Sequence, residues 1–269
     1  MQVQAGRKFR FGGLDAVNIL VMIYLMLPIV IIILFSFNAT SATVFPIQAL
    51  SLKWYLELFA SGMLLDALKN SILVGLAVAL VSVLIGTLAS FALTRYRFRL
   101  KRVVTFGVLV PITLPPIVIG IALLSFFAAL DLPRSLLTVM ISHVLFCAPF
   151  AILVMNSRLE GFDIAVEEAA QDLGANRLQT FRYITFPLIR PSLIGALMLT
   201  FGLSFDEFLV TFFVVGRKNT LPIVIWGMLR RGVSPSINAI ATMVLIISMT
   251  LIVLANRYAK IRMLHTGGS

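Results

Sequence analysis

Six blocks of apolar residues, each long enough to cross a lipid bilayer, constrain this chain more than any other feature of its sequence. A helix needs about 20 apolar residues to cross roughly 30 Å of hydrocarbon. Among open chains, only a helix satisfies its own backbone hydrogen bonds in lipid. We therefore expect an all-α membrane protein with six transmembrane helices. The blocks cover residues 16–37, 71–93, 103–130, 136–155, 193–215 and 237–255.

The composition agrees with a lipid environment. Hydrophobic residues make up 60% of the chain and charged residues only 12%, whereas a soluble domain has about 25% charged residues. A net charge of +11 would suggest nucleic acid as the partner of a soluble protein, but here the Lys and Arg residues lie between the apolar blocks. We expect no nucleic-acid partner. The single cysteine, Cys147, has no disulfide partner in the chain and is expected to be a packing residue.

The positions of Lys and Arg indicate the direction of the crossings. If the N-terminus is inside, 15 of the 22 Lys and Arg residues fall in cytoplasmic segments and 7 in outer segments. Because cytoplasmic loops carry the excess of positive charge, both termini are expected in the cytoplasm. Residues 1–67 then hold a cytoplasmic N-terminal segment, the first transmembrane helix and an external helix. Residues 68–256 form the transmembrane domain, and residues 257–269 form a cytoplasmic tail.

The external helix is expected at residues 51–59, in the first long connection. Leu52, Tyr55, Leu56 and Phe59 share one helical face, and Ser51 is a suitable N-cap. Two interpretations remain open. The helix lies at the membrane interface with its aromatic residues at headgroup level, or it is buried against the outer ends of the bundle.

The second long connection, residues 157–191, has the pattern of two short helices that meet at a bend. Asp163 is a suitable cap for the first helix, and Gly174 provides the left-handed residue that ends it. Asn176 and Gln179 form a capping box for the second helix, which Pro187 is expected to stop. A compact unit of this kind on the cytoplasmic face presents a defined surface to a partner protein.

This connection resembles a known family. Glu168-Ala169-Ala170, then Gly174 after three residues, then Ile184-Thr185-Phe186-Pro187 after nine more, is similar to the EAA loop of type I ABC importer permeases. Phe186 replaces the usual leucine. The resemblance covers about residues 68–256 and implies a coupling helix that docks on a separate ATPase subunit. The residues that it assigns to coupling are Glu167, Glu168, Ala169, Ala170, Asp172, Gly174, Ala175 and Pro187.

The resemblance also implies partners and a location. The chain has no phosphate-binding loop and no Gly-Lys pair, so we expect it not to be an enzyme and to hold no cofactor, with ATP and Mg bound by the partner ATPase. The expected partners are a second permease subunit in a heterodimer, two copies of an ATP-binding subunit and an extracytoplasmic substrate-binding protein. The expected location is the bacterial inner membrane, crossed several times.

A candidate solute path lies in the fifth block. Asp206 and Glu207 are expected near the middle of this helix, where a charged side chain is costly and typically functional. Polar residues at helical spacing form one stripe (Thr200, Ser204, Glu207 and Thr211), and aromatic residues form a second stripe beside it (Phe201, Phe205, Phe208 and Phe212). Acids beside aromatic rings favour an amine as the solute. The alternative is that these carboxylates bond the partner permease or line the outer vestibule. The predicted path residues are Asp206, Glu207, Ser204, Phe205, Phe208 and Thr211.

Several stretches are similar to the second permease of spermidine and putrescine importers. These stretches are residues 203–208 and 220–239, together with residues 96–98 and 173–175. Permeases for other small solutes, such as opines, amino acid derivatives and phosphonates, share much of this pattern and remain alternatives. The outer segments carry seven basic residues and only three acids, so capture of a polycation is expected to be the work of the binding protein.

Two other classes of protein are weighed against the permease. A gradient-driven carrier typically shows an internal repeat with broken helices, and none is found here. A membrane enzyme needs a catalytic or metal-binding constellation, which the two distant histidines and one cysteine do not supply. His143 is accordingly expected to have no metal or catalytic role. Pro111, Pro115 and Pro116 should kink or interrupt the third crossing.

Overall fold

The computed structural model of the chain describes residues 13–41, 45–232 and 234–266, without the side chains of 251–266. All regular elements among the described residues are helices, and the described chain forms two compact units. One unit comprises Gly62–Gly227, and the other comprises Met1–Ser61 with Met228–Ser269. The predicted cytoplasmic segment before residue 13 lies outside the described residues, as do the side chains of the predicted tail, 257–269.

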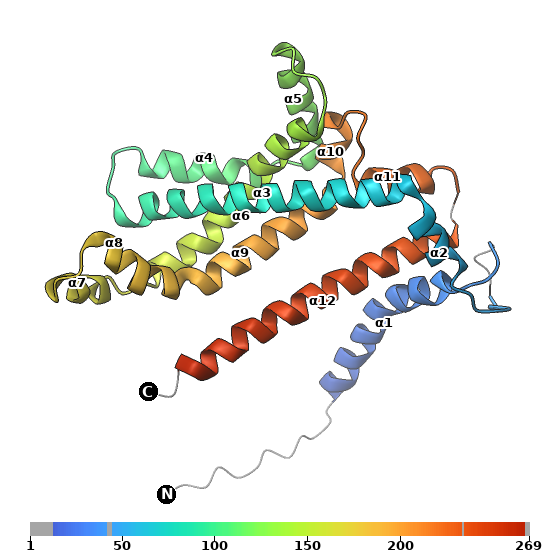
Figure 1. The fold of residues 1–269 in the computed structure, drawn as a ribbon, viewed down its shortest axis with the longest axis horizontal. Helices are drawn as coiled ribbons and strands as arrows, with labels where there is room; N and C mark the ends of the chain where they lie inside the picture. Colours follow the sequence, from blue (N-terminus) through green and yellow to red (C-terminus); the bar gives the residue numbers. More distant parts are fainter. Residues whose placement is uncertain (1–12, 42–44, 233, 267–269) are drawn as a thin grey trace, which may run out of the picture. The chain divides into compact units, whose positions relative to one another are not determined.

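Three long helices form the centre of the Gly62–Gly227 unit (Figure 1). They are α3 (Gly62–Arg95), α6 (Leu136–Glu160) and α9 (Phe186–Asp206), and each packs against the other two. Gly86 allows α3 and α6 to approach closely, because a Cβ atom at this position would lie 2.6 Å from the Cβ atom of Ala151. The predicted packing role of Cys147 is confirmed, since its side chain is fully buried between Val78, Val139 and Val214 in the core.

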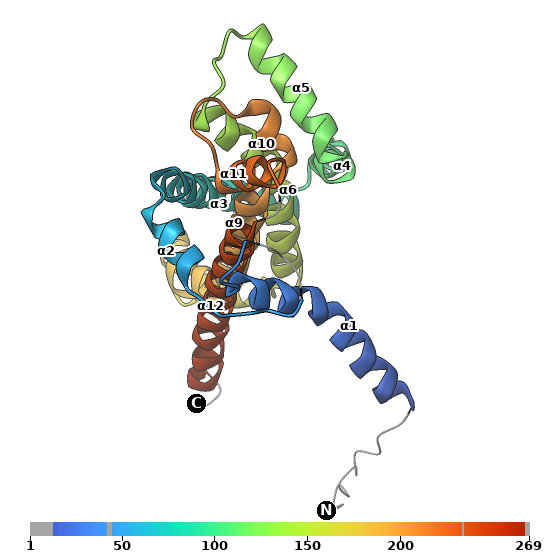
Figure 2. The same cartoon turned by 90° about the vertical axis from the view of Figure 1, so that its right-hand side faces the viewer.

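The predicted third crossing is two helices instead of one. Helices α4 (Lys101–Thr113) and α5 (Pro116–Ala129) meet at an angle of 105°. In Figure 2, α4 is seen nearly end-on and α5 runs away from it. The predicted interruption is confirmed at Pro115 and Pro116, where the ring of Pro116 occupies the first helical position of α5 and the residues before it are extended.

The predicted fifth crossing is also broken. Helix α9 ends at Asp206, Glu207 is extended (φ −70°, ψ 110°), and the short helix α10 covers Leu209–Val214. The expectation of one continuous helix over 193–215 is therefore wrong. Helix α11 (Leu221–Leu229) follows after a loop. The loop is tied to α3 by the Ser71 hydroxyl, which accepts a hydrogen bond from the Leu221 N–H group (2.8 Å).

The second unit contains α1 (Gly13–Ser36), α2 (Lys53–Ala60) and α12 (Pro235–Thr266), with α1 and α2 both packed on α12. Leu52, not the predicted Ser51, is the N-cap residue of α2, although the Ser51 hydroxyl accepts a hydrogen bond from the N–H group of Lys53 (3.1 Å). The buried face of α2 differs from the predicted one. Trp54 and Leu58 are buried, because the Trp54 indole donates to the Asn38 carbonyl (2.6 Å), while Leu56 stays exposed. That exposed apolar face keeps the interfacial interpretation open.

Four of the described helices are long and apolar enough to cross a membrane, namely α1, α3, α6 and the continuous helical stretch Arg177–Asp206, and the bent pair α4–α5 raises the number to five. The described apolar part of α12, Pro235–Thr250, is shorter. An all-α membrane fold is therefore confirmed. The number of six crossings and the cytoplasmic position of both termini stay predictions.

Candidate functional site

The connection between α6 and α9 folds as a bent helical element. Helix α7 (Ala165–Asp172) is followed by α8 (Arg177–Thr180), which continues through a π-helical turn, Phe181–Thr185, into α9 (Figure 1). We call residues 163–185 the coupling element. It lies at the end of the unit where α3 and α6 finish and α9 begins, since Glu167 of α7 contacts Arg95 at the end of α3.

The bend of the coupling element is a left-handed glycine cap. Gly174 has a φ of +92°, a conformation that glycine adopts without a steric penalty. Its N–H group donates to the Gln171 carbonyl (2.9 Å), and the N–H group of Ala175 donates to the Ala170 carbonyl (3.0 Å). This pair of bonds is a Schellman motif, which satisfies the last carbonyl groups of α7. The prediction that Gly174 ends this helix in the left-handed conformation is confirmed.

The start of α8 matches the sequence prediction, whereas α7 starts one residue later than predicted, with Ile164 at the N-cap position. The Asp163 carboxylate accepts a hydrogen bond from the Ala165 N–H group (3.0 Å), at the first residue of α7. The side chain of Asn176 accepts from the Gln179 N–H group (2.9 Å), and the Gln179 side chain accepts from the Asn176 N–H group (2.8 Å). The predicted capping box is therefore present.

Pro187 does not stop the second helix, contrary to the prediction. Helical structure runs on from Arg177 to Asp206. The π-helical turn before Pro187 gives the reason, because the Phe186 N–H group bonds the carbonyl five residues back, at Phe181. Widening the helix in this way accommodates a proline that cannot donate a hydrogen bond and would otherwise clash with the preceding turn. Helix α8 is thus mechanically continuous with α9.

Glu167 faces inward, whereas its neighbour Glu168 faces solvent. The Glu167 carboxylate lies 3.1 Å from the Arg95 guanidinium and accepts a hydrogen bond from the Thr185 hydroxyl (2.5 Å). The Arg95 side chain also stacks over the Phe162 ring at 5.2 Å. Because the Glu167 side chain is only 17% exposed, it joins α7, the end of α3 and the π-helical turn. Its role is to position the coupling element. Of the other predicted coupling residues, Glu168, Ala169, Asp172, Gly174 and Pro187 are exposed, and Ala170 and Ala175 are half-buried.

Replacing Glu167 with alanine is expected to loosen the coupling element. The change leaves the Arg95 guanidinium and the Thr185 hydroxyl without their shared partner, and an unpaired, partly buried group costs on the order of 1–3 kcal/mol. The backbone amides of 165–172 should therefore exchange hydrogen about tenfold faster, as measured by mass spectrometry. Glu168→Ala is the matched control and should leave these rates unchanged. Equal rates in wild type and Glu167→Ala would contradict the positioning role.

The candidate solute path lies at the break between α9 and α10, where the two acids behave differently. The Glu207 carboxylate accepts a hydrogen bond from the Val210 N–H group (2.9 Å) and so caps α10. Asp206 is exposed at the end of α9, and no hydrogen bond or ion pair to its carboxylate is found within the described part of the chain. Of the two acids, Asp206 is the one that presents a free carboxylate.

His143, from α6, holds the break together. Its ring nitrogens lie 2.8 Å from the Ser204 hydroxyl and 2.8 Å from the Thr211 hydroxyl, so it bridges α9 and α10. All three side chains are buried, and Thr200 is buried too, with its hydroxyl bonded to the Ala196 carbonyl (2.7 Å). The predicted polar stripe is thus largely a set of groups that satisfy one another inside the helix bundle. Sequence reasoning missed His143, because its partners lie 61 and 68 residues away.

Aromatic rings lie on both sides of the break. Phe201 and Phe205 stack with ring centroids 5.6 Å apart, and Phe208 contacts Phe212 at 5.7 Å and Trp226 at 5.2 Å. Phe205 and Phe208 are half-buried. The free carboxylate of Asp206 is therefore next in sequence to one ring and two residues from another.

The structure combines long apolar helices, a capped and bent element between two of them, and a broken helix with a free acid. These features are typical of a membrane-embedded permease, the helical subunit of a transport system. The family described as binding-protein-dependent transport system inner membrane component matches residues 82–261, which include the whole coupling element. The chain belongs to this family and is a multi-pass protein of the inner membrane.

Two similar proteins are themselves transport permeases, in agreement with this family. The chain is 37% identical over 256 residues to the spermidine/putrescine transport system permease protein PotC of Escherichia coli (strain K12), covering 95% of each chain. It is 35% identical over 231 residues to the putrescine transport system permease protein PotI of the same organism, covering 82% of each chain. These relatives are permease subunits of transport systems, not enzymes.

Solved structures show the same fold. A bacterial ABC transporter that imports the acidic polysaccharide alginate matches with a TM-score of 0.65 at 18% identity, covering 95% of this chain and 99% of that one. The methionine ABC transporter MetNI matches with a TM-score of 0.56 at 18% identity, covering 77% of this chain and 98% of that one. The predicted ABC importer permease fold is therefore confirmed.

Proposed function

We propose that the chain is the permease subunit of an ATP-driven importer for polyamines such as spermidine and putrescine. The observation that carries this proposal is the 37% identity to PotC over 95% of both chains. The similarity covers both the coupling element and the break at Asp206. The chain supplies half of the membrane path and contains no ATPase of its own.

The proposed assembly contains four other subunits. A second permease pairs with this chain as a heterodimer, two copies of an ATP-binding subunit hold ATP and Mg, and a substrate-binding protein delivers the solute from outside. The exposed residues of the coupling element, Glu168, Ala169, Asp172 and Gly174, are proposed to contact the ATP-binding subunit. Ala170 and Ala175 are half-buried beside that surface, Pro187 is exposed just beyond the element, and Glu167 positions the surface.

The continuity of α8 and α9 supplies a mechanism. The helical stretch Arg177–Asp206 has 30 residues, about 45 Å at 1.5 Å per residue. Its first end belongs to the coupling element, and its last residue is the free acid, Asp206. When ATP draws the two ATP-binding subunits together, a push on α8 is transmitted along this helix to the break at Glu207. The solute path would then change its opening from the cytoplasmic to the outer side.

The chemistry around Asp206 fits an amine. An exposed carboxylate attracts a cationic group, and the neighbouring faces of Phe205 and Phe208 attract both the cation and its methylene groups. The path residues Ser204, Thr211 and Glu207 shape the break instead of offering free polar groups. Phosphonates, which are anionic, and opines or other amino acid derivatives remain the alternatives to be tested.

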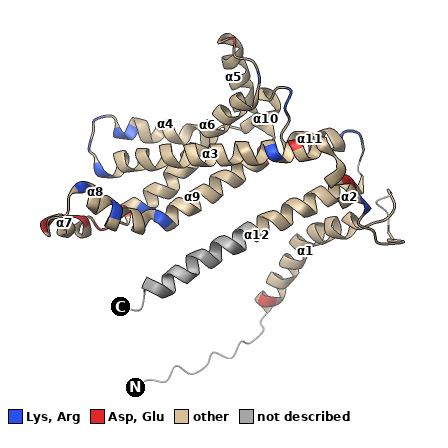
Figure 3. Ribbon diagram, in the orientation of Figure 1, with Lys and Arg blue, Asp and Glu red and all other residues tan. Residues whose placement is uncertain are grey.

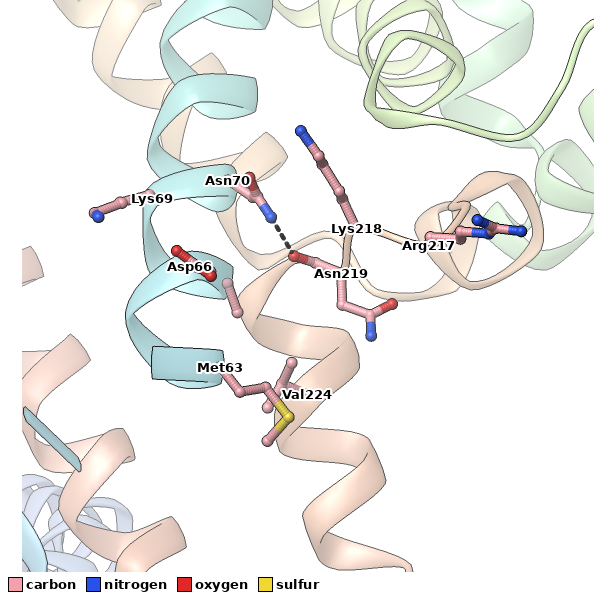
Figure 4. A pocket seen from close by; sticks show the side chains of 9 residues that line it. Met63, Asp66, Lys69, Asn70, Arg217, Lys218, Asn219 and Val224 are labelled. Atoms are coloured by element: carbon pink, nitrogen blue, oxygen red, sulfur yellow. Dashed lines mark hydrogen bonds between the residues drawn. The ribbon is translucent and has the colours of Figure 1, made fainter. Parts of the chain in front are cut away.

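The charge at the Gly62 end of α3 supports capture of the amine by the binding protein and not by this chain. A pocket of about 370 Å³ at this end includes Lys69, Arg217 and Lys218 but only one acid, Asp66. Figure 4 shows the three basic side chains pointing in different directions, while Asn70 donates to the Asn219 carbonyl (2.9 Å) and holds the pocket's two walls together. A surface of this sign repels a free polycation.

Uptake of labelled spermidine in cells that lack their own polyamine importers tests the proposal. Cells that express the chain with its partner subunits should accumulate spermidine and putrescine, and excess unlabelled phosphonate or opine should not compete. Asp206→Asn should lower the uptake about tenfold or more, since a hydrogen bond to a charged group contributes about 1.5–3 kcal/mol. The matched control, Asp66→Asn, should transport normally. Uptake that is blocked by a phosphonate or an opine, but not by spermidine, would point to the alternative solutes.

A further inference from the structure

The connection between α3 and α4 forms a cavity of about 510 Å³ on the surface of the Gly62–Gly227 unit. Its lining is apolar and cationic, apart from Thr105. Phe98, Phe106 and Leu109 are apolar, and Arg99, Lys101 and Arg102 are cationic. No part of the coupling element and no residue of the candidate solute path lines this cavity. We call this cavity the α4 cavity.

Among the residues that the structure describes, no acid pairs with the cations of the α4 cavity. The ion pairs between side chains in the described regions join Lys53 to Glu57 and Arg95 to Glu167, and the first turn of α4 contains no acid. Figure 3 shows the contrast, with basic residues at the α3–α4 connection and acidic residues on α7. Three adjacent, unpaired cations repel one another, so an anion that binds among them is stabilised by all three.

The rest of α4 is mostly apolar and half-buried or exposed. None of its residues is buried, and Val103 and Phe106 are 66% and 68% exposed. In a membrane protein, apolar side chains exposed in this way contact the acyl chains of lipids. Along the chain, the cations at 99–102 come first and the apolar residues of α4 follow directly. The ligand that matches this order has an anionic head and an apolar tail.

We propose that the α4 cavity binds an anionic phospholipid, with its phosphate among Arg99, Lys101 and Arg102 and an acyl chain against Phe106 and Leu109. Basic pockets between transmembrane segments on the cytoplasmic side are suited to acidic headgroups. Helix α4 provides the apolar surface for the acyl chains. By the predicted direction of the crossings, this lipid belongs to the inner leaflet.

Lipid binding by the full chain, purified in detergent together with its partner subunits, tests the proposal, with native mass spectrometry as the readout. Phosphatidylglycerol should bind in preference to phosphatidylcholine with the same acyl chains. The triple variant Arg99→Gln, Lys101→Gln, Arg102→Gln should weaken phosphatidylglycerol binding about tenfold or more, because each cation near an anionic lipid contributes severalfold. Phosphatidylcholine binding should stay the same. Phe106→Asn should weaken the binding of both lipids.

A second triple variant, Arg177→Gln, Arg182→Gln, Arg190→Gln, removes the same charge elsewhere and should leave the preference for phosphatidylglycerol intact. Equal losses in both triple variants would overturn the proposal, since they would indicate an effect of net charge alone. Equal binding of the two lipids would also overturn it. So would displacement of phosphatidylglycerol by an equal concentration of inorganic phosphate. A loss of co-purified ATP-binding subunit with unchanged lipid binding would show a protein-docking surface instead.

Discussion

Valine in place of Gly174 is expected to reduce solute uptake to background while the protein still inserts into the membrane at normal levels. Gly174 has a φ of +92°, and a residue with a Cβ atom pays about 1–2 kcal/mol there, more when it is β-branched. A Cβ atom at Gly174 would meet nothing within 4 Å, so the cost arises in the backbone and not from a clash. The Schellman motif opens, and α7 loses its fixed angle to α8. Uptake and membrane content, measured in the same cells, check this result.

Two control variants separate this effect from a general loss of glycine. Gly174→Asn should keep most of the uptake, because asparagine tolerates the left-handed conformation. Gly195→Val should also keep it, since Gly195 lies within α9 and has open space around its Cβ position. If Gly174→Val transports as well as these controls, the bend has no part in coupling.

Leucine in place of Gly86 is expected to disrupt the bundle itself. A Cβ atom at Gly86 would lie 2.6 Å from the Ala151 Cβ atom and 3.0 Å from the backbone of Ala151 and Ile152. The obstacle includes the backbone of α6, which cannot rotate away like the end of a flexible side chain. Helices α3 and α6 must move apart, and overpacking of a tight contact typically costs about 1–3 kcal/mol, and occasionally more. We expect the melting temperature in detergent to fall by about 5 °C or more and uptake to fall with it.

Gly107→Leu is the matched control for this substitution. Gly107 also lies in a helix, α4, but a Cβ atom there would meet nothing within 4 Å. Its melting temperature should stay close to that of the wild type. A similar decrease in both variants would mean that leucine destabilises the helices themselves and that the contact of α3 with α6 is not tight. Gly174→Val strains only the bend and leaves the contact of α3 with α6 intact, so it should lower the melting temperature less than Gly86→Leu while it abolishes uptake; this difference distinguishes a coupling defect from a folding defect.

Features set by neighbouring residues could be predicted from the sequence. Asp163, Gly174, and the pair Asn176 and Gln179 act on backbone groups within five residues of themselves. Capping depends on such local hydrogen bonds, so the residue type and its spacing suffice. The break at Pro116 belongs to the same group, because a proline disfavours the helical conformation in the residue before it and fits the first position of a new helix.

Features that depend on distant partners could not be predicted. The bridge from His143 to Ser204 and Thr211 spans at least 61 residues, and the ion pair of Glu167 with Arg95 spans 72. Both assign a structural task to residues that the sequence pattern placed in the solute path or on the coupling surface. The break after Asp206 has no proline or glycine to mark it, and Glu207 stabilises it by capping α10.

The apolar blocks, the distribution of positive charge and the local caps were enough to establish a helical membrane protein with a bent element between two spans. These properties follow from the length of each block and from contacts a few residues apart. Which acid is free, which is occupied, and whether α8 continues into α9 depended on packing between helices. Hydrogen bonds in a dry interior form between groups that are close in space. Groups far apart in the sequence become close only when the chain folds, so the sequence alone does not show these pairs.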